Sequence, residues 1–461
     1  MAHILFLSSM RPTAVRHFHS TQPQPWLVPV GLTCAGMFIG TRYIMRVQER
    51  VRRRRAGLFE DKDDDKSDKH ASSLNEVQQI LGVDVGSSNL RIATASLRDF
   101  AVSARVIESA DGLRAIPAAV AVDNDSISVG AIAKSLQGRK HGYTATATRL
   151  LLVDTIEKIE REKLIKKLPY RTYSPEWAAE MMLDYLHTTA VTSLGDDPMK
   201  NLSAVLAVPA GTNEQERAEY EQVANSAGFN VIAAIDEPVA ALHAVQRCVM
   251  EELHSPEILS SRGPIAVLDI GGYVSTVSLL EKERHGIGFS VLHTMSTVAV
   301  SGHLVNELLF RSVVEKFKED HGIDLSVDYM ASYRILEAVE SAKIELSSRL
   351  SSGINLPFIT ADRKGAKHLV HTITAFSLAH VQESLARDAI ALCDHALYDA
   401  GVSKQDLSGF VFIGGGAKSK FMRQQLEAYF KRPAFKTKSF NPEEAVVLGA
   451  SEYGRQLIQE Y

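Results

Sequence analysis

The chain has 461 residues, which is enough for a large core and for two or three compact units. Hydrophobic residues make up 45% and charged residues 23% of it, which excludes the disordered and fibrous classes. The net charge of the chain is −4, but it is unevenly distributed. Residues 1–59 carry nine arginines, one glutamate and no lysine, which gives them a charge of +8 and leaves −12 for residues 60–461. Such a remainder has no broad basic surface, which argues against nucleic acid as the main partner. The three cysteines show no metal-site or disulfide spacing, which fits a reducing compartment.

Residues 1–25 have the composition of a mitochondrial targeting leader. They contain no acid, and they combine the apolar run Ile4–Leu7 with hydroxyl residues, Arg11 and Arg16. Residues 16–21 also resemble the Arg-x-Phe-x-x-Ser/Thr processing pattern of precursors imported into the mitochondrial matrix. The alternative is a secretory signal, which would direct the chain to the endoplasmic reticulum, but the run Ile4–Leu7 is short for its hydrophobic core.

Residues 26–45 are predicted to form a single transmembrane helix. Trp26–Thr41 is an apolar run of 16 residues, and it reaches a spanning length if it extends to Met45. Six arginines follow within residues 46–55, which is typical of the positive-inside end of a membrane segment. The alternative is a second part of the targeting signal. Residues 46–77 continue as a charged linker, because their dense run of Asp and Lys cannot form a core.

The stretch Ile80–Thr94 contains the first candidate site. Two apolar runs flank residues Gly86, Ser87 and Ser88, which predicts a strand, a tight turn and a returning strand. Gly86 allows close approach of a ligand, and the amides and hydroxyls that follow could face phosphate oxygens. Asp84, at the end of the first strand, could hold Mg²⁺ through water. Hairpins of this kind also occur in proteins that bind no phosphate.

A second stretch, Ile265–Leu280, repeats this pattern about 185 residues later. It reads as an apolar strand, Asp269-x-Gly271-Gly272, a polar turn and another apolar strand. Two such hairpins predict a duplicated architecture whose halves face each other across a nucleotide.

Between the hairpins, apolar strands alternate with amphipathic helices, which is the pattern of an α/β protein. Helices are expected at 175–193 and 214–228, and a buried strand at Ala204–Pro209. No Gly-x4-Gly-Lys-Ser/Thr loop and no Gly-x-Gly-x-x-Gly fingerprint occurs in the sequence, so P-loop and Rossmann interpretations lack their defining residues.

An ordered set of short motifs runs through the chain. The motifs are Asp84 to Ser88, Val208 to Ala210 with Asn213 and Arg217, Ala227 to Val231, Asp236 to Ala241, Asp269 to Gly272, Glu340 to Lys343 with Leu346 to Ser348, Gly414 to Gly416, and Asn441 to Val446. Together they resemble the ATPase domain of the seventy-kilodalton heat-shock chaperones over residues 78–458. The resemblance implies the actin-like ATPase fold, with two lobes, each built on a mixed sheet of duplicated design, and a nucleotide cleft between them. The lobes would span 78–262 and 263–440, with residues 441–461 as a C-terminal helix returning to lobe I.

The resemblance also implies a Mg²⁺-ATP or Mg²⁺-ADP site. The residues placed there are Gly86, Ser87 and Ser88 in the first phosphate loop, Gly271 and Gly272 in the second, Asp84 and Asp269 beside Mg²⁺, Glu237 as the glutamate of the family's Asn-Glu-Pro motif, Glu340, Lys343 and Ser347 at ribose and adenine, Gly414 and Gly415 in the adenosine loop, Lys418 in place of a base-stacking arginine, and Glu443 near base and ribose. Glu237 and Asp269 would be the catalytic residues that remain.

Three departures from the family pattern concern hydrolysis. The lysine that contacts the γ-phosphate is replaced by Thr148, the γ-phosphate-sensing threonine by Val274, and the aspartate of the second loop by Thr276. A short neutral side chain cannot neutralise the charge that develops in phosphoryl transfer. These changes predict a weak or inactive ATPase, unless Lys140 or Arg149 substitutes for the lost lysine.

Other departures concern partners and organisation. Ile344 replaces an adenine-stacking arginine, and Ala233 replaces an arginine that meets J-domain proteins in the family. The chain is also expected to lack a peptide-binding domain, because it ends at Tyr461, just after the ATPase-domain helix.

The function predicted from these features is a nucleotide-dependent, chaperone-related adaptor at a mitochondrial membrane. The inner membrane with the domain in the matrix is favoured, and an outer-membrane anchor facing the cytosol is the alternative. Chaperones, J-domain proteins and nucleotide-exchange proteins are the candidate partners. Two other functions remain open: an active but slow ATPase that assists folding or import, and a scaffold that binds no nucleotide.

Overall fold

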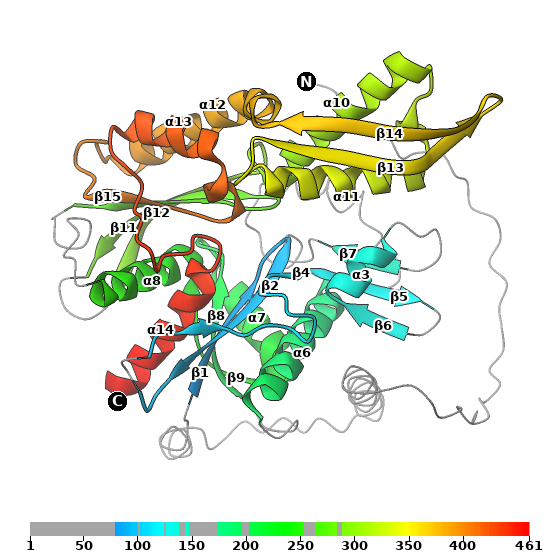
Figure 1. Cartoon of the computed structure of the whole chain (residues 1–461). Helices are drawn as coiled ribbons and strands as arrows, with labels where there is room; N and C mark the ends of the chain where they lie inside the picture. Colours follow the sequence, from blue (N-terminus) through cyan, green and yellow to red (C-terminus); the bar gives the residue numbers. More distant parts are fainter. Residues whose placement is uncertain are drawn as a thin grey trace, which may run out of the picture.

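The computed structural model of the chain describes residues 79–99, 102–123, 126–137, 143–146, 174–195, 202–252, 263–283 and 288–460. These residues form two lobes, one above the other in Figure 1, and the first and last described elements both belong to the lower one. The predicted leader, membrane segment and linker lie outside the described residues, and so does Thr148. No helix in the described part of the chain combines the length and the apolar composition that crossing a membrane requires.

Lobe I contains the hairpin predicted around Gly86, and the structure confirms it. Strands β1 and β2 pair antiparallel, with Asp84 opposite Arg91, and β1 pairs parallel with β8, which is buried at every position. The sheet has the order β3-β2-β1-β8-β9, with β4 paired to β2. Its strands are β1 (Gln79–Val85), β2 (Asn89–Ser96), β3 (Arg105–Val106), β4 (Ile116–Pro117), β8 (Leu202–Val208) and β9 (Phe229–Asp236).

Two helices pack against this sheet, α6 (Pro175–Leu194) and α7 (Glu214–Ser226). The Ser174 hydroxyl accepts from the amide of Trp177 at the start of α6, and Pro175 occupies the first turn, where its missing N–H is not needed. Asn213 caps the start of α7 with a reciprocal capping box, which supports the helix predicted from residue 214. The α/β organisation predicted for this region is therefore confirmed.

Lobe II repeats the arrangement. Strands β10 and β11 pair antiparallel around Gly271 and Gly272, β10 pairs parallel with β15, and the sheet order is β12-β11-β10-β15. Its core is separate from that of lobe I, with helices α10, α12 and α13 packed on the sheet. These elements are β10 (Ile265–Ile270), β11 (Ser275–Lys282), β12 (Phe289–Thr297), β15 (Gly409–Ile413), α10 (Gly302–His321), α12 (Ala375–Asp399) and α13 (Lys420–Phe430).

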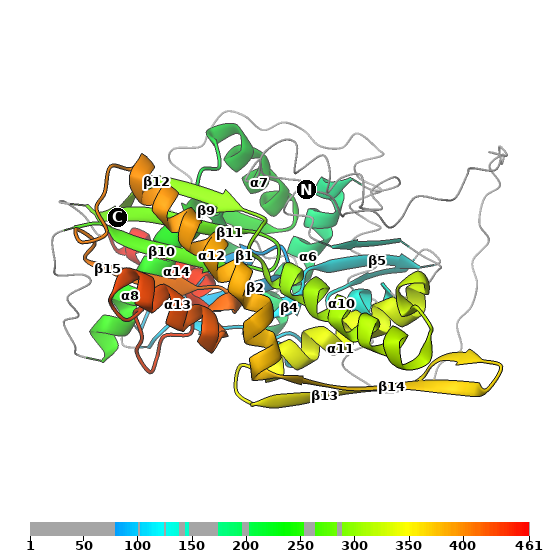
Figure 2. The same cartoon turned by 90° about the horizontal axis from the view of Figure 1, so that it is seen from above.

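Each lobe also carries a smaller unit on the same side of the molecule, to the right in Figure 1. On lobe I it is a three-stranded sheet with α3, and on lobe II it is the long β13–β14 hairpin beside α11, seen from above in Figure 2. The elements are β5 (Ala119–Asp123), β6 (Ser126–Val129), β7 (Tyr143–Thr146), α3 (Ala131–Leu136), α11 (Tyr329–Glu345), β13 (Ser351–Asp362) and β14 (Gly365–Thr374), with the short 3-10 turn η1 (Leu325–Val327) before α11. A second 3-10 turn, η2 (Gly415–Lys418), follows β15 in the main part of lobe II.

Two helices, α8 (Glu237–Glu251) and α14 (Ala445–Glu460), lie between the two sheets (Figure 1). They share a third core, to which β8 and β9 contribute from lobe I and β10, β12 and β15 from lobe II. Gly449 allows the close crossing of the helices, because a Cβ there would overlap the carbonyl oxygen of Ala240. This core joins the lobes along one side and leaves the cleft at the turns of the two hairpins.

Candidate functional site

A cavity of about 710 Å³ lies between the lobes, within the range of small-molecule sites. It brings together every predicted site residue that the structure describes. These are Asp84, Gly86, Ser87, Ser88, Glu237, Asp269, Gly271, Gly272, Val274, Thr276, Glu340, Lys343, Ser347, Gly414, Gly415, Lys418 and Glu443.

The two glycine turns meet at the floor of the cavity. The Gly86 amide donates to the Asn89 carbonyl over 2.9 Å, and the Gly271 amide donates to the Val274 carbonyl over 3.1 Å, so both turns close in the same way. A Cβ on Gly272 would overlap the Ser88 hydroxyl, so only glycine allows the turns to come this close. The amides of Ser87, Ser88 and Gly272 donate no hydrogen bond to the part of the chain that is described. They form a set of donors of the kind that binds phosphate.

Three carboxylates border these turns. Asp84 ends β1 and is 7% exposed, Asp269 lies at the matching place in β10, and Glu237 begins α8. Nowhere in the described ranges do three or more His, Cys, Asp or Glu side chains form a group that could hold a metal by itself. Mg²⁺ does not need such a group, because it binds through one or two carboxylates, water and substrate phosphates. The donor set is therefore compatible with Mg²⁺ brought in by a nucleotide.

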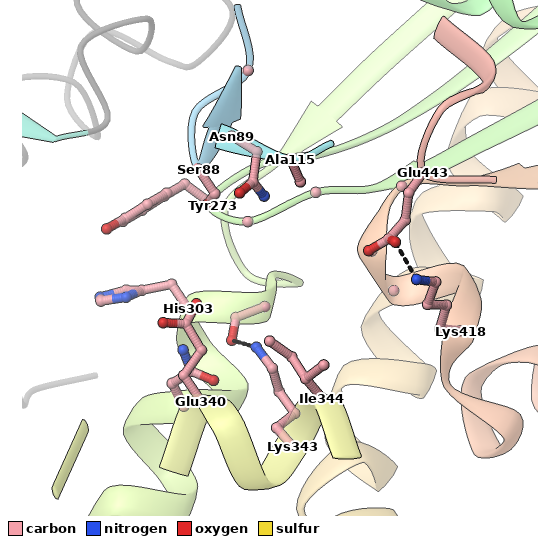
Figure 3. A pocket seen from close by; sticks show the side chains of 18 of the residues that line it. Ser88, Asn89, Ala115, Tyr273, His303, Glu340, Lys343, Ile344, Lys418 and Glu443 are labelled. Carbon is pink, nitrogen blue, oxygen red and sulfur yellow. Dashed lines mark hydrogen bonds and ion pairs between the residues drawn. The ribbon is translucent and has the colours of Figure 1, made fainter. Parts of the chain in front are cut away.

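The far end of the cavity is built by residues 414–418 and 442–443. Lys418 forms an ion pair with Glu443, shown as a dashed line in Figure 3. The Gly414 amide donates to the Pro442 carbonyl over 3.0 Å, which holds these two segments together. Gly414 has a φ of 79°, and a Cβ there would meet the Asp269 carboxylate, so glycine is required on both counts.

Helix α11 lines one wall with Glu340, Lys343 and Ser347, the last just beyond its end. The Lys343 ammonium donates to the Gly302 carbonyl over 3.0 Å. Burial lowers the pKa of Lys343 to about 8, a direction that Lys134 reinforces and Glu340 opposes. The Ser347 hydroxyl donates to the Ile344 carbonyl over 2.7 Å and remains partly exposed to the cavity.

A contact across the cleft, which the sequence did not indicate, joins α3 of lobe I to α11 of lobe II. The Lys134 ammonium lies 2.5 Å from a Glu340 carboxylate oxygen. The Tyr333 hydroxyl donates to the Lys134 carbonyl over 2.6 Å, and the Tyr329 hydroxyl donates to the Gln137 carbonyl over 2.6 Å. We call these three contacts the α3–α11 latch.

Three further cavity residues escaped the sequence reasoning: Arg91, Tyr273 and His303. The signal for Arg91 was present, because hairpin pairing around the Gly86 turn puts it opposite Asp84. Tyr273 follows Gly272 directly, at the position where the resemblance to the family implies a third glycine. No local signal pointed to His303.

Two of the three positions that depart from the family pattern, Val274 and Thr276, line the cavity at the glycine turns. The Val274 side chain has no polar atom, and the Val274 carbonyl already accepts a hydrogen bond from the Gly271 amide. The Thr276 hydroxyl lies 3.0 Å from the Ser296 hydroxyl, on the neighbouring strand. Neither side chain supplies a charge to the cavity.

Comparison with known proteins agrees with this geometry. Residues 80–457 match the family model described as Hsp70 protein. The chain belongs to the Hsp70 family. This confirms the resemblance to the ATPase domain of these chaperones, and the mixed sheets with flanking helices fit the actin-like fold of Hsp70 proteins.

One curated relative is the yeast (Saccharomyces cerevisiae) protein described as heat shock protein SSC3, mitochondrial. It is 33% identical over 389 residues, which cover 81% of this chain and 57% of the relative. The match thus spans little more than half the length of that Hsp70 protein.

Proposed function

We propose that this Hsp70-family chain binds ADP or ATP with Mg²⁺ in the cleft between its lobes. The observation that carries the proposal is the meeting of the two glycine turns. Within the described residues, the amides of Ser87, Ser88 and Gly272 in these turns donate no hydrogen bond, and Asp84 and Asp269 lie beside them. The phosphates would lie on these turns, and Mg²⁺ would neutralise part of their charge near the two aspartates. The residues that would hold ribose and adenine are Glu340, Lys343, Ser347, Gly414, Gly415, Lys418 and Glu443.

We further propose that hydrolysis is weak or absent. Glu237 and Asp269 remain at the cleft, but Val274 and Thr276 supply no charge where the family has groups that hold the γ-phosphate and water. Thr148, outside the described residues, lacks the length and charge of the family's lysine. Lobe closure around a bound nucleotide would then serve to present or hide a surface for other chaperones, J-domain proteins or nucleotide-exchange proteins.

The proposed location is a mitochondrial membrane. The acid-free leader and the apolar residues 26–45 support it, and so does the similarity to a relative whose name places it in mitochondria. In this proposal residues 46–77 link the membrane segment to lobe I (78–262), lobe II (263–440) and the returning helix (441–461).

Nucleotide binding can be tested on the full-length chain purified in detergent. Mg²⁺-ADP should raise the melting temperature, because a ligand at 100 times its Kd stabilises the folded state by about 2.7 kcal/mol. Asp269→Ala and Gly271→Glu should abolish the shift. Gly353→Ala is the matched control, because a Cβ there would meet nothing within 4 Å.

The rate of ATP hydrolysis by the same preparation distinguishes the proposed adaptor from an active but slow ATPase. We expect little hydrolysis, and partial recovery only in the triple variant Thr148→Lys, Val274→Thr, Thr276→Asp, because such residues act as a unit. Robust hydrolysis by the unaltered chain would favour the slow but active ATPase. Absence of any thermal shift at millimolar nucleotide, with folding verified, would favour the scaffold.

A further inference from the structure

The phosphate end of the cleft carries a pair of stacked aromatic rings. Tyr273 follows Gly271 and Gly272 directly in the turn between β10 and β11, and its ring lies 4.6 Å from that of His303 at an angle of 23°. Both residues line the cavity. Figure 3 shows the two rings side by side near Ser88, at the end of the cavity opposite the Lys418–Glu443 pair.

The stack is held by the turn that it borders. The His303 amide donates to the Gly272 carbonyl over 2.7 Å, and the Gly302 amide donates to the Gly271 carbonyl over 3.0 Å. The first turn of α10 and the glycine turn are therefore one unit. These main-chain bonds keep the backbones of Tyr273 and His303 next to each other, which allows the two rings to stack at the edge of the cavity.

The electrostatics of this wall do not favour additional negative charge. The Glu307 carboxylate, one turn along α10, lies 3.4 Å from Nε2 of His303. A carboxylate therefore stands directly behind this wall, and its charge repels a further phosphate. The Tyr273 ring adds bulk where the family has a glycine, and the next residue, Val274, adds no hydrogen-bond donor from its side chain.

We propose that the Tyr273–His303 stack closes the phosphate end of the cleft, so that the site takes a nucleoside diphosphate in preference to a triphosphate. This inference rests on the proposed nucleotide binding and deepens it by naming the ligand. The turns accept the first two phosphates, and the stack occupies the direction in which a third would extend. The occupancy of the site would then follow the concentration of ADP more closely than that of ATP.

Competition binding against a fluorescent ADP analogue, on the full-length chain in detergent with Mg²⁺, tests the inference. The wild type should bind ADP at least about ten-fold more tightly than ATP. Tyr273→Gly should bring the two affinities within about three-fold of each other by raising that for ATP, while the affinity for ADP stays within about three-fold of wild type. His303→Ala should shift the ratio in the same direction.

Two controls keep a structural effect apart from selectivity. Tyr273→Phe retains the stacked ring and should preserve the wild-type ratio. Tyr398→Ala removes an aromatic ring that is 85% exposed and lies outside the cavity, and it should change neither affinity. Equal binding of ADP and ATP by the wild type, or an unchanged ratio in Tyr273→Gly, would overturn the role of the stack alone. Failure of the wild type to bind either nucleotide would overturn the proposed function as well.

Discussion

Among single residues, Arg91 is a cation that lines the cleft close to the proposed phosphate site. It stands opposite Asp84 in the β1–β2 hairpin, so the two side chains share a face of the sheet, and both line the cavity. Lys134, Lys343 and Lys418 are each engaged by a carboxylate or a carbonyl. Within the described ranges the charge of Arg91 acts on the nearby Glu444 carboxylate, whose pKa it helps to lower, but no hydrogen bond fixes the guanidinium there, so it can turn to a phosphate oxygen in the cavity.

Arg91→Ala should therefore weaken ADP binding. A hydrogen bond to a charged group contributes about 1.5–3 kcal/mol, so the expected loss is at least about ten-fold in affinity. Isothermal titration of the full-length chain measures it, and Arg91→Lys should keep part of the affinity because it keeps the charge. Arg105→Ala is the matched control, because Arg105 is an exposed arginine on the neighbouring strand β3 and does not line the cavity. An Arg91→Ala variant with wild-type affinity would exclude this contact.

At the scale of elements, the α3–α11 latch connects the lobes at the mouth of the cleft. The Lys134 and Glu340 side chains are 38% and 33% exposed, so their ion pair contributes no more than about 1 kcal/mol. The hydroxyls of Tyr329 and Tyr333 donate to the main-chain carbonyls of Gln137 and Lys134, respectively, so these bonds persist when the Lys134 side chain is removed. Each contact of the latch is thus weak, and the interaction between the lobes is distributed over three contacts.

Lys134→Ala should speed the release of ADP by about two- to five-fold, and combination with Tyr333→Phe should speed it further, because a second contact across the cleft is lost. Stopped-flow release of a fluorescent ADP gives both rates. Lys316→Ala breaks a comparable exposed ion pair, to Asp320 on α10, and serves as the control. Release that is as slow in the double variant as in wild type would show that the latch does not limit opening.

Across the whole molecule, the N-terminal 59 residues are positively charged and the rest of the chain is negatively charged. Residues 1–59 carry +8 and the remainder −12. If residues 26–45 cross the inner membrane, moving each of the six arginines at 46–55 outward against the potential would cost about 2.3 kcal/mol per 100 mV. The lobes should then face the matrix.

Fractionation of mitochondria measures this placement. The protein should resist carbonate extraction, and its lobes should resist protease in intact mitochondria and in mitoplasts. Release into the carbonate supernatant would argue against the membrane segment. Digestion of the lobes before the outer membrane is opened would place them in the cytosol instead. Replacement of Arg52 to Arg55 by glutamine should weaken the orientation without affecting the lobes.

Local sequence patterns were sufficient to predict the elements that form through contacts between neighbouring residues. A glycine turn between apolar runs suffices to predict a hairpin, and both hairpins formed, around Gly86 and around Gly271. The cap at Asn213 and the buried strand around Ala204 follow equally from neighbours in the chain. Because the family motifs are short and ordered, they also predicted which residues would gather in one cavity.

Tertiary structure decided what depends on distant segments. Lys134 and Glu340 are 206 residues apart in the sequence, and the closeness of Ser88 to Gly272 depends on how the two lobes pack on α8 and α14. The stack of Tyr273 on His303 requires the bond between the Gly272 turn and the start of α10. Hydrogen bonding and turn geometry act over a few residues, whereas the approach of side chains across a cleft is set by burial of a shared core, and no local pattern records it.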